Sequence, residues 1–157
     1  MLSIIPDTSC LILLSKIGAC QLLPLMYGKV LVPEIVLKEF KEIFPIPHQI
    51  INCQNTPLLK KLETQLDSGE AAVICAGLET KESIVAIDDL KGRKIASSLG
   101  LRVTGTLGIL VKAKRNGHIT VLEPLVEKLI QVGIRISPTI IEEIRKDYPW
   151  AILIWSK

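Results

Sequence analysis

The sequence predicts an α/β fold with a central, mostly parallel sheet of four to five strands between two layers of helices. Short apolar runs alternate with longer stretches of helical periodicity, which is the pattern of βαβ units. With 157 residues, 48% of them hydrophobic and 22% charged, the chain can bury a substantial core. No internal repeat or linker is visible. We therefore expect one domain over residues 1–157, to which C-terminal helices and an apolar tail, about 121–157, are appended.

The strands are expected where short aliphatic runs stand between polar or turn-forming residues. The run Ile84-Val85-Ala86-Ile87 has this form, as does Ile4-Ile5-Pro6 near the start of the chain. The five expected strands cover residues 3–6, 29–32, 49–53, 83–87 and 102–104. The third of them is expected at an edge of the sheet.

The helices are expected where apolar residues recur at helical spacing. Pro33 opens one of them, because proline is tolerated in a first helical turn, and Gly117 ends another. The proline-rich segment 44–48 is expected to be a loop. The predicted helices cover residues 11–25, 33–44, 57–66, 69–80, 91–99, 106–116, 122–132 and 138–146.

The cysteines of the chain show no CxxC spacing, and most of them lie beside apolar residues. They are Cys10, Cys20, Cys53 and Cys75. This pattern favours buried, reduced thiols over a metal knuckle or a disulfide framework, and it indicates a cytoplasmic location. No apolar run approaches ~20 residues, and Asp7 interrupts the first of them, so we expect neither a membrane span nor a signal peptide.

Three of the five aspartates fall at the ends of predicted strands. Asp7 follows the first strand, and Asp88 and Asp89 follow the fourth. In a parallel sheet, ligands bind in the crevice beyond the carboxyl ends of the strands. Carboxylates that converge there repel each other unless a cation lies between them. The arrangement therefore indicates a hard divalent metal ion and metal-assisted phosphoryl chemistry.

Two glutamates are expected on apolar helix faces, where a charge needs a partner. The apolar face of the helix predicted over residues 33–44 is formed by Ile35, Val36, Phe40 and Ile43. Glu39 falls inside this arc. Glu70 precedes three residues of the apolar face of its own helix at spacings of three, four and seven. Together with the strand-end aspartates, these two glutamates form a candidate four-carboxylate cluster.

Each member of this cluster also has a simpler explanation. Asp7 and Asp88 are placed to cap the helices that follow them. Glu70 lies in a first helical turn, where a negative charge is favourable in any case. Glu39 can lie at the edge of its face and reach water or a lysine. The joint placement of the four acids is what favours the metal site.

Charge is unevenly distributed, although the net charge is only +3. Residues 90–122 hold seven Lys or Arg and no acid, whereas residues 60–89 hold seven acids and three lysines. An acidic cluster beside a basic stretch suits a site that holds a metal ion and binds a polyanion, and solvated basic helix faces explain the pattern equally well. The two histidines, His48 and His118, are far apart in sequence and indicate neither a histidine-based ribonuclease nor a zinc site.

Short motifs follow one another in order from the N-terminus to about Gly133. They are Asp7-Thr8-Ser9, Val32-Pro33-Glu34, Glu39-Phe40, Ser68-Gly69-Glu70-Ala71, Ile87-Asp88-Asp89, Gly92-Arg93 and Gly105-Thr106-Leu107-Gly108. In order and spacing they resemble the PIN-domain nucleases, in particular the branch related to the VapC-type toxin ribonucleases. The resemblance implies a PIN-like three-layer α/β/α fold. It also implies a metal-dependent endoribonuclease that acts as the toxin of a toxin–antitoxin pair.

The resemblance implies roles for individual residues. Carried over position by position, the family's acids that bind Mg²⁺ or Mn²⁺ and carry the catalysis match Asp7, Glu39, Glu70 and Asp89. Asp88 is an adjacent reserve ligand, because consecutive strand residues point to opposite faces.

Other residues are given supporting roles. Thr8 and Ser9 are expected to hydrogen-bond the metal shell or a carboxylate, or to cap a helix. Lys91, Arg93 and Lys94 are expected to contact the RNA backbone, which contributes affinity without sequence choice. The partners implied are an RNA substrate, an antitoxin protein and a second copy of the chain in a homodimer, with no membrane partner.

Two features depart from the family pattern. Cys10 stands where this branch commonly has proline, which affects the loop behind Asp7 more than the chemistry. The tail 148–155 holds both tryptophans and is strongly apolar. It suits a dimer partner or an antitoxin peptide if it is exposed, and it packs as a final strand or core flap if it is not.

Three other functions use similar acids or a similar fold. A phospho-receiver domain needs an aspartate at the end of the third strand, where this chain has Cys53-Gln54-Asn55. A phosphatase of the haloacid-dehalogenase type needs a second Asp two residues after the first, where this chain has Ser9. Each of these two functions therefore requires an aspartate that this chain lacks at the corresponding position. A non-catalytic nuclease-like module that binds an antitoxin or RNA stays open.

Overall fold

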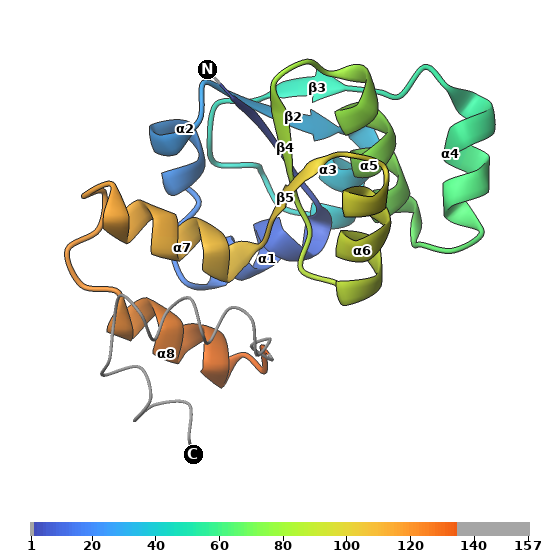
Figure 1. Cartoon of the computed structure of the whole chain (residues 1–157). Coiled ribbons are helices and arrows are strands. Elements are labelled where there is room, and N and C mark those ends of the chain that lie inside the picture. Colours follow the sequence, from blue (N-terminus) through green and yellow to red (C-terminus); the bar gives the residue numbers. More distant parts are fainter. Residues whose placement is uncertain (1, 135–157) are drawn as a thin grey trace. The chain divides into compact units, whose positions relative to one another are not determined.

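The computed structural model describes residues 2–134, which form a five-stranded parallel sheet in the order β3-β2-β1-β4-β5 (Figure 1). The strands are β1 (Ser3–Pro6), β2 (Lys29–Pro33), β3 (Gln49–Ile51), β4 (Ser83–Ala86) and β5 (Arg102–Thr104). All four pairings between neighbouring strands of this sheet are parallel. Each expected strand is present with small shifts of its ends, and β3 lies at an edge. The predicted three-layer α/β/α fold is confirmed.

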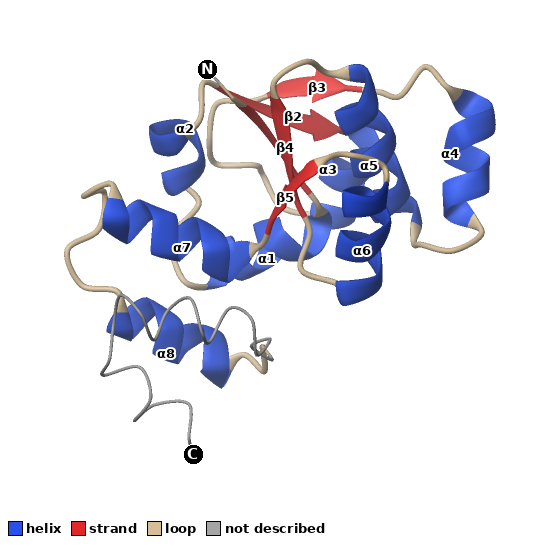
Figure 2. Cartoon of the chain, in the orientation of Figure 1, coloured by secondary structure: helices blue, strands red, loops and turns tan. Residues whose placement is uncertain are grey.

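A helix follows each of the five strands, as βαβ units require (Figure 2). In the described part of the chain they are α1 (Thr8–Lys16), α2 (Leu22–Met26), α3 (Glu34–Phe40), α4 (Thr56–Glu63), α5 (Ser68–Glu79), α6 (Leu90–Ser98), α7 (Thr106–Arg115) and α8 (Glu123–Gln131). Short loops join them to the strands. The carboxyl ends of the strands therefore meet the amino ends of helices at one edge of the sheet.

The single helix predicted over residues 11–25 was wrong, because the structure has two helices there. Gly18 has a φ of 70°, in the left-handed region that glycine adopts easily. The Ala19 amide donates to the Leu14 carbonyl at 2.8 Å, and the Gly18 amide donates to that of Ser15 at 3.1 Å. These two bonds close α1 with a Schellman motif. The continuous apolar pattern on both sides of Gly18 concealed this turn.

The helix predicted over residues 33–44 is also shorter than expected. It ends at Phe40, because Lys41 has a φ of 61° and breaks the helical path. Ile43 was expected on the apolar face of this helix and is instead 95% exposed. Val36 and Phe40 are buried as expected. The functional consequence is that Glu39 lies in the last turn of α3 rather than in its middle.

Helix α5 packs against the centre of the sheet. Every residue from Gly69 to Gly77 is buried, so the helix has no polar face over this length. A Cβ at position 77 would lie 2.8 Å from the Val85 side chain of β4, so glycine is required for the close approach of helix and strand. This packing holds the N-terminus of α5, with Glu70, in place.

The expectation of four reduced thiols was wrong for two of the cysteines. Cys10 and Cys20 are buried and free, but Cys53 and Cys75 form a disulfide, with their Cα atoms 5.6 Å apart. Cys53 follows β3 and Cys75 lies in α5, so tertiary packing rather than closeness in sequence brings them together. Cysteine spacing in the sequence carries no signal for such a pair.

The chain divides into two compact units, Met1–Thr106 and Leu107–Lys157. The first holds the whole sheet and helices α1 to α6. In the second, α8 buries Val126 and Leu129. The expected helix at 138–146 and the apolar tail 148–155 lie outside the described residues. None of the helices within residues 2–134 has the length and apolar character needed to cross a membrane.

Candidate metal centre

The direction of the chain across the sheet reverses between β1 and β4. From β1 the chain continues to β2 and β3 on one side, and β4 is followed by β5 on the other. Such a switch point leaves a crevice beyond the carboxyl ends of the two strands. Pro6 pairs with Ala86 at these ends, and the Asp7 amide donates to the Ala86 carbonyl at 2.9 Å. The aspartates after β1 and β4 therefore begin side by side.

Asp7 is the most deeply buried acid at this edge, with only 1% of its surface exposed. Its Oδ1 atom accepts a hydrogen bond of 2.8 Å from the Cys10 amide and so caps α1. Its Oδ2 atom is buried and has no hydrogen-bond partner within the described part of the chain. Burial, with the charges of Asp88 and Glu70 adding to it, raises the pKa of Asp7 to about 8.

Glu70 lies in the first turn of α5 and is 9% exposed. Asp67 caps this helix, because its Oδ1 atom accepts from the Glu70 amide at 2.8 Å. Burial, with the negative charges of Asp67, Asp89 and Glu39 adding to it, raises the pKa of Glu70 to about 7. Glu70 therefore interacts electrostatically with the cap of its own helix and with acids from two other segments, at the end of α3 and the start of α6.

Glu39 reaches the same region from the end of α3. Its Oε1 atom accepts a hydrogen bond of 3.1 Å from the Thr8 hydroxyl of α1. A Cβ at position 69 would lie 2.5 Å from that oxygen and 3.2 Å from the Thr8 hydroxyl, so glycine leaves room for both groups. Glu39 is exposed, contrary to its expected place on a buried face. It belongs to the cluster because its carboxylate reaches across to α1 and α5.

Asp89 approaches Glu70 at the start of α6. Its Oδ2 atom accepts from the Gly92 amide at 2.9 Å and caps the helix. A Cβ at position 92 would lie 3.5 Å from Glu70 Oε2 and 3.7 Å from Asp89 Oδ2. The two carboxylates thus face one point above Gly92. The charge of Glu70 interacts with those of Asp7, Glu39 and Asp89, which come from other segments. Among the described residues, no three of these four acids place ligand atoms within 4.8 Å of one another.

A family model described as a PIN domain matches residues 3–148. The chain belongs to the PIN-domain family. PIN domains are generally nucleases, and they generally use divalent metal ions. The family assignment confirms the resemblance seen in the motifs, whereas the relation to VapC-type toxins stays a prediction. No curated protein gave a significant match.

Asp88 has a different environment from Asp89 in this PIN domain. Both of its oxygens are engaged by Thr106, since Oδ1 accepts from the backbone amide at 2.8 Å and Oδ2 from the hydroxyl at 2.6 Å. Asp88 is half-buried, whereas Asp89 is exposed and has one oxygen outside its cap. Asp88 therefore holds the end of β5 and the start of α7 against the site, and its charge contributes to the raised pKa of Asp7.

Sequence reasoning omitted Asp67 from the PIN-domain cluster. Its negative charge raises the pKa values of both Asp7 and Glu70. A signal for this role was present, because Asp67 stands three residues before Glu70 in a position typical of a helix N-cap. A capping carboxylate in that position lies beside the acid of the first turn.

The remaining predicted site residues surround this cluster. Thr8 binds Glu39, and Ser9 is exposed on the first turn of α1. Lys91 and Lys94 are exposed on α6, where a polyanion can reach them. Arg93 is half-buried, and its Nη1 atom donates to the Ile87 carbonyl at 3.2 Å. One nitrogen of its guanidinium is therefore already hydrogen-bonded to a backbone carbonyl of the protein.

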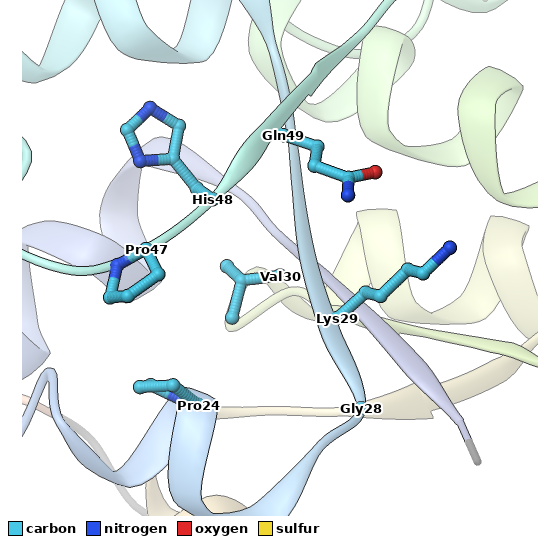
Figure 3. Close-up of a pocket in the computed structure, with 7 residues that line it drawn as sticks. All are labelled: Pro24, Gly28, Lys29, Val30, Pro47, His48 and Gln49. Carbon is cyan, nitrogen blue, oxygen red and sulfur yellow. The ribbon is translucent and has the colours of Figure 1, made fainter.

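A pocket of about 200 Å³ lies elsewhere on the sheet (Figure 3). Its lining includes Lys29 and Gln49, the first residues of β2 and β3, so it opens at the amino ends of these strands. His48 also lines it, and the Nδ1 atom of His48 is 2.8 Å from the Ile46 carbonyl. None of the described residues that line this pocket carries a carboxylate, and the pocket lies at the end of the sheet opposite to the acids.

Proposed function

We propose that this PIN domain is a metal-dependent endoribonuclease that hydrolyses phosphodiester bonds of RNA. The observation that supports this most directly is the buried, unpartnered Oδ2 atom of Asp7, beside the charges of Glu70, Asp67 and Asp88. A buried anionic oxygen without a partner is costly. A cation bound between the carboxylates removes that cost.

The chemistry of the donor set indicates which ion fits. All of the donors are carboxylate oxygens, which suit Mg²⁺ and Mn²⁺ better than zinc or copper. The residues proposed to hold the ion are Asp7, Glu39, Glu70 and Asp89, with Asp88 in reserve. A divalent ion bound there would supply an activated water and stabilise negative charge on the scissile phosphate.

The chain's own residues position this centre. Thr8 orients Glu39 through its hydroxyl, and Asp67 holds the backbone of Glu70. Gly69 leaves space for the Glu39 carboxylate. Such supporting contacts typically change metal affinity by about 10- to 100-fold. No protein nucleophile is required.

RNA binding is proposed for the basic residues of α6. Lys91 and Lys94 are exposed in the helix that Asp89 caps, so a phosphate backbone that reaches the acids also passes these lysines. Contacts of this kind contribute affinity rather than sequence choice. Arg93 is proposed to assist with the donors that its bond to Ile87 leaves open.

The biological role is proposed on the resemblance to VapC-type toxins. In this proposal the protein is the toxin of a toxin–antitoxin pair and forms a homodimer in the cytoplasm. Light scattering of the purified chain tests the dimer. Growth arrest on expression, relieved by co-expression of an antitoxin from the same operon, tests the toxin role.

Cleavage of a labelled single-stranded RNA tests the enzyme directly. The wild type is expected to cleave with Mg²⁺ or Mn²⁺ and not with EDTA, whereas Asp7→Asn, Glu70→Gln and Asp89→Asn are expected to be inactive. Glu63→Gln, an exposed acid on α4, is the matched control and should cleave normally. Equal cleavage by all variants would refute the mechanism. RNA binding without Mn²⁺ uptake in calorimetry would instead indicate the non-catalytic module.

A further inference from the structure

Cys53 and Cys75 form a pair outside the carboxylate cluster. Cys53 lies in the segment between β3 and α4, and Cys75 lies in α5. Their sulfur atoms are joined in the structure, and their Cα atoms are 5.6 Å apart, within the range that a disulfide spans. We propose that this pair is a reversible thiol–disulfide modification site that fastens the β3–α4 segment to α5.

The backbone around the pair is held in position by Glu79, one turn after Cys75 on α5. The Glu79 carboxylate accepts hydrogen bonds from the Gln54 amide at 2.8 Å and from the Asn55 amide at 3.0 Å. Asn55 in turn caps α4 through the Leu58 amide at 3.1 Å. These bonds do not involve the sulfur atoms. They keep Cys53 opposite Cys75 in the reduced protein as well, so closing the disulfide needs little movement.

The same residues offer a metal site as the competing explanation. Ligand atoms of Cys53, Cys75 and Glu79 lie within 4.8 Å of one another, and two thiolates with a carboxylate suit zinc. The carboxylate oxygens of Glu79, however, already accept hydrogen bonds from the Gln54 and Asn55 amides. The Cα separation of 5.6 Å lies within the range of a disulfide. This separation and the engaged carboxylate of Glu79 therefore favour the disulfide.

The exposure of the two cysteines sets the order of the reaction. Cys53 is half-buried, whereas Cys75 is fully buried. The Cys53 thiolate attacks a low-molecular-weight disulfide such as oxidised glutathione, which forms a mixed disulfide and releases one glutathione thiolate. The Cys75 thiolate then displaces the second glutathione thiolate. In total, two protein thiols lose two electrons and two protons, and one glutathione disulfide becomes two glutathione thiols.

The segment that the disulfide fastens lies at the edge of the first unit, and its other attachments include the Glu79 hydrogen bonds and the packing of α4 on α5. Strand β3 has three residues, two of them exposed, and among the described strands it pairs with β2 alone. Figure 1 shows α4 beyond the edge of the sheet, joined to the rest of the unit by loops at both of its ends. Such a segment opens before the core does. The cross-link joins positions 22 residues apart and thus limits this opening.

The test uses the full chain equilibrated in mixtures of reduced and oxidised glutathione. Samples are quenched with acid, unfolded, alkylated and analysed by peptide mass spectrometry. Cys53 and Cys75 are expected to lose alkylation together as the mixture becomes oxidising, while Cys10 and Cys20 stay alkylated throughout. Independent titration of the two cysteines, or full alkylation of both in oxidised glutathione, would overturn the proposal.

Limited proteolysis measures the consequence. Reduction is expected to increase cleavage within residues 41–67 by roughly tenfold or more. Cys53→Ser should be cleaved at the faster rate under both conditions, and Cys20→Ser, a buried cysteine outside the pair, should keep the redox dependence. If Cys53→Ser does not fold, alkylation of the wild type decides the question alone. Stoichiometric Zn²⁺ binding that protects both thiols in reducing buffer would show a metal site and contradict the proposal.

Discussion

Glu39 accepts a hydrogen bond of 3.1 Å from Thr8, a residue 31 positions earlier in the chain, and the same carboxylate oxygen lies directly over Gly69. Three segments, the start of α1, the end of α3 and the start of α5, therefore meet at one exposed acid. The position of Glu39 depends on the absence of a side chain at residue 69. That dependence makes the carboxylate cluster testable without removing any of its acids.

Gly69→Ala is expected to lower the affinity for Mn²⁺ by about 10- to 100-fold while leaving the fold intact. The added methyl group would lie 2.5 Å from Glu39 Oε1 and would displace it, although alanine itself favours a helix. Calorimetry measures the affinity, and circular dichroism checks the fold. Ser68→Ala, the neighbouring exposed residue, is the control. Unchanged Mn²⁺ binding by Gly69→Ala would show that Glu39 is not part of the metal centre.

Asp7→Asn is expected to stabilise the metal-free protein at pH 8 by about 1–2 kcal/mol and to abolish cleavage. The amide keeps an acceptor for the Cys10 amide and removes a buried negative charge that faces other carboxylates. Chemical denaturation in EDTA measures the stability. A variant less stable than the wild type in EDTA would contradict the account of Asp7 as a strained, functional acid.

The metal-free protein is expected to lose stability as the pH rises from about 4 to about 8. The pKa of Asp7 is raised from 3.8 to about 8, so in this range the folded protein holds a proton that the unfolded chain releases. The stability from this group is complete below pH 4 and is lost as the pH passes the folded value. Glu70, with a pKa of about 7, contributes in the same direction.

Thermal melts between pH 5 and pH 8 check this dependence. Saturating Mn²⁺ is expected to reverse its sign, because the ion binds only the deprotonated ligands. Asp7→Asn should remove most of the slope in EDTA. A metal-free protein whose melting temperature rises over this range would contradict the prediction.

Asp88→Asn and Thr106→Val are each expected to destabilise the protein by about 1–3 kcal/mol. Each variant disrupts the hydrogen bonding between Asp88 and Thr106, and Thr106 is fully buried. The double variant should cost less than the sum of the two single variants, which shows that they act through one contact. Denaturant titrations of all three measure this. Asp89→Asn is the comparison, with little loss of stability and a large loss of Mn²⁺ binding.

Lys91→Ala and Lys94→Ala are expected to weaken RNA binding and to reduce its salt dependence. Each lysine that contacts a phosphate contributes about 0.7 to the slope of log affinity against log salt concentration for a single strand. Fluorescence anisotropy at several salt concentrations measures this slope. Lys60→Ala, an exposed lysine on α4, is the control and should leave the slope unchanged.

Most of the fold was predictable because its signals are local. The alternation of strands and helices follows from short apolar runs and helical periodicity, and the structure places each expected strand where these runs occur. The errors fall where a single backbone conformation overrides a continuous pattern, as at Gly18 and Lys41. Neither residue disturbs the hydrophobic periodicity around it.

The acids of the candidate site were predictable where an acidic residue follows a predicted strand or interrupts an apolar helix face. Asp7 and Asp89 follow strands, and Glu70 stands out of pattern on an apolar helix, so each carries a signal in the sequence itself. Glu39 was included because it was expected on a buried helix face, but the structure shows that it is exposed. Asp67 was overlooked although its N-cap position three residues before Glu70 is visible in the sequence. Its interaction with Asp7, by contrast, is decided by tertiary packing.

The amino-acid order alone determined the element types, the acids at the strand ends and the caps, since these depend on neighbours within a few residues. The order of the strands, with its reversal between β1 and β4, was decided only by tertiary packing. Tertiary packing also decided three contacts between side chains. They are Glu39 with Thr8, Asp88 with Thr106, and Cys53 with Cys75. Each joins residues between 18 and 31 positions apart, and such contacts depend on how helices pack on the sheet rather than on local propensity.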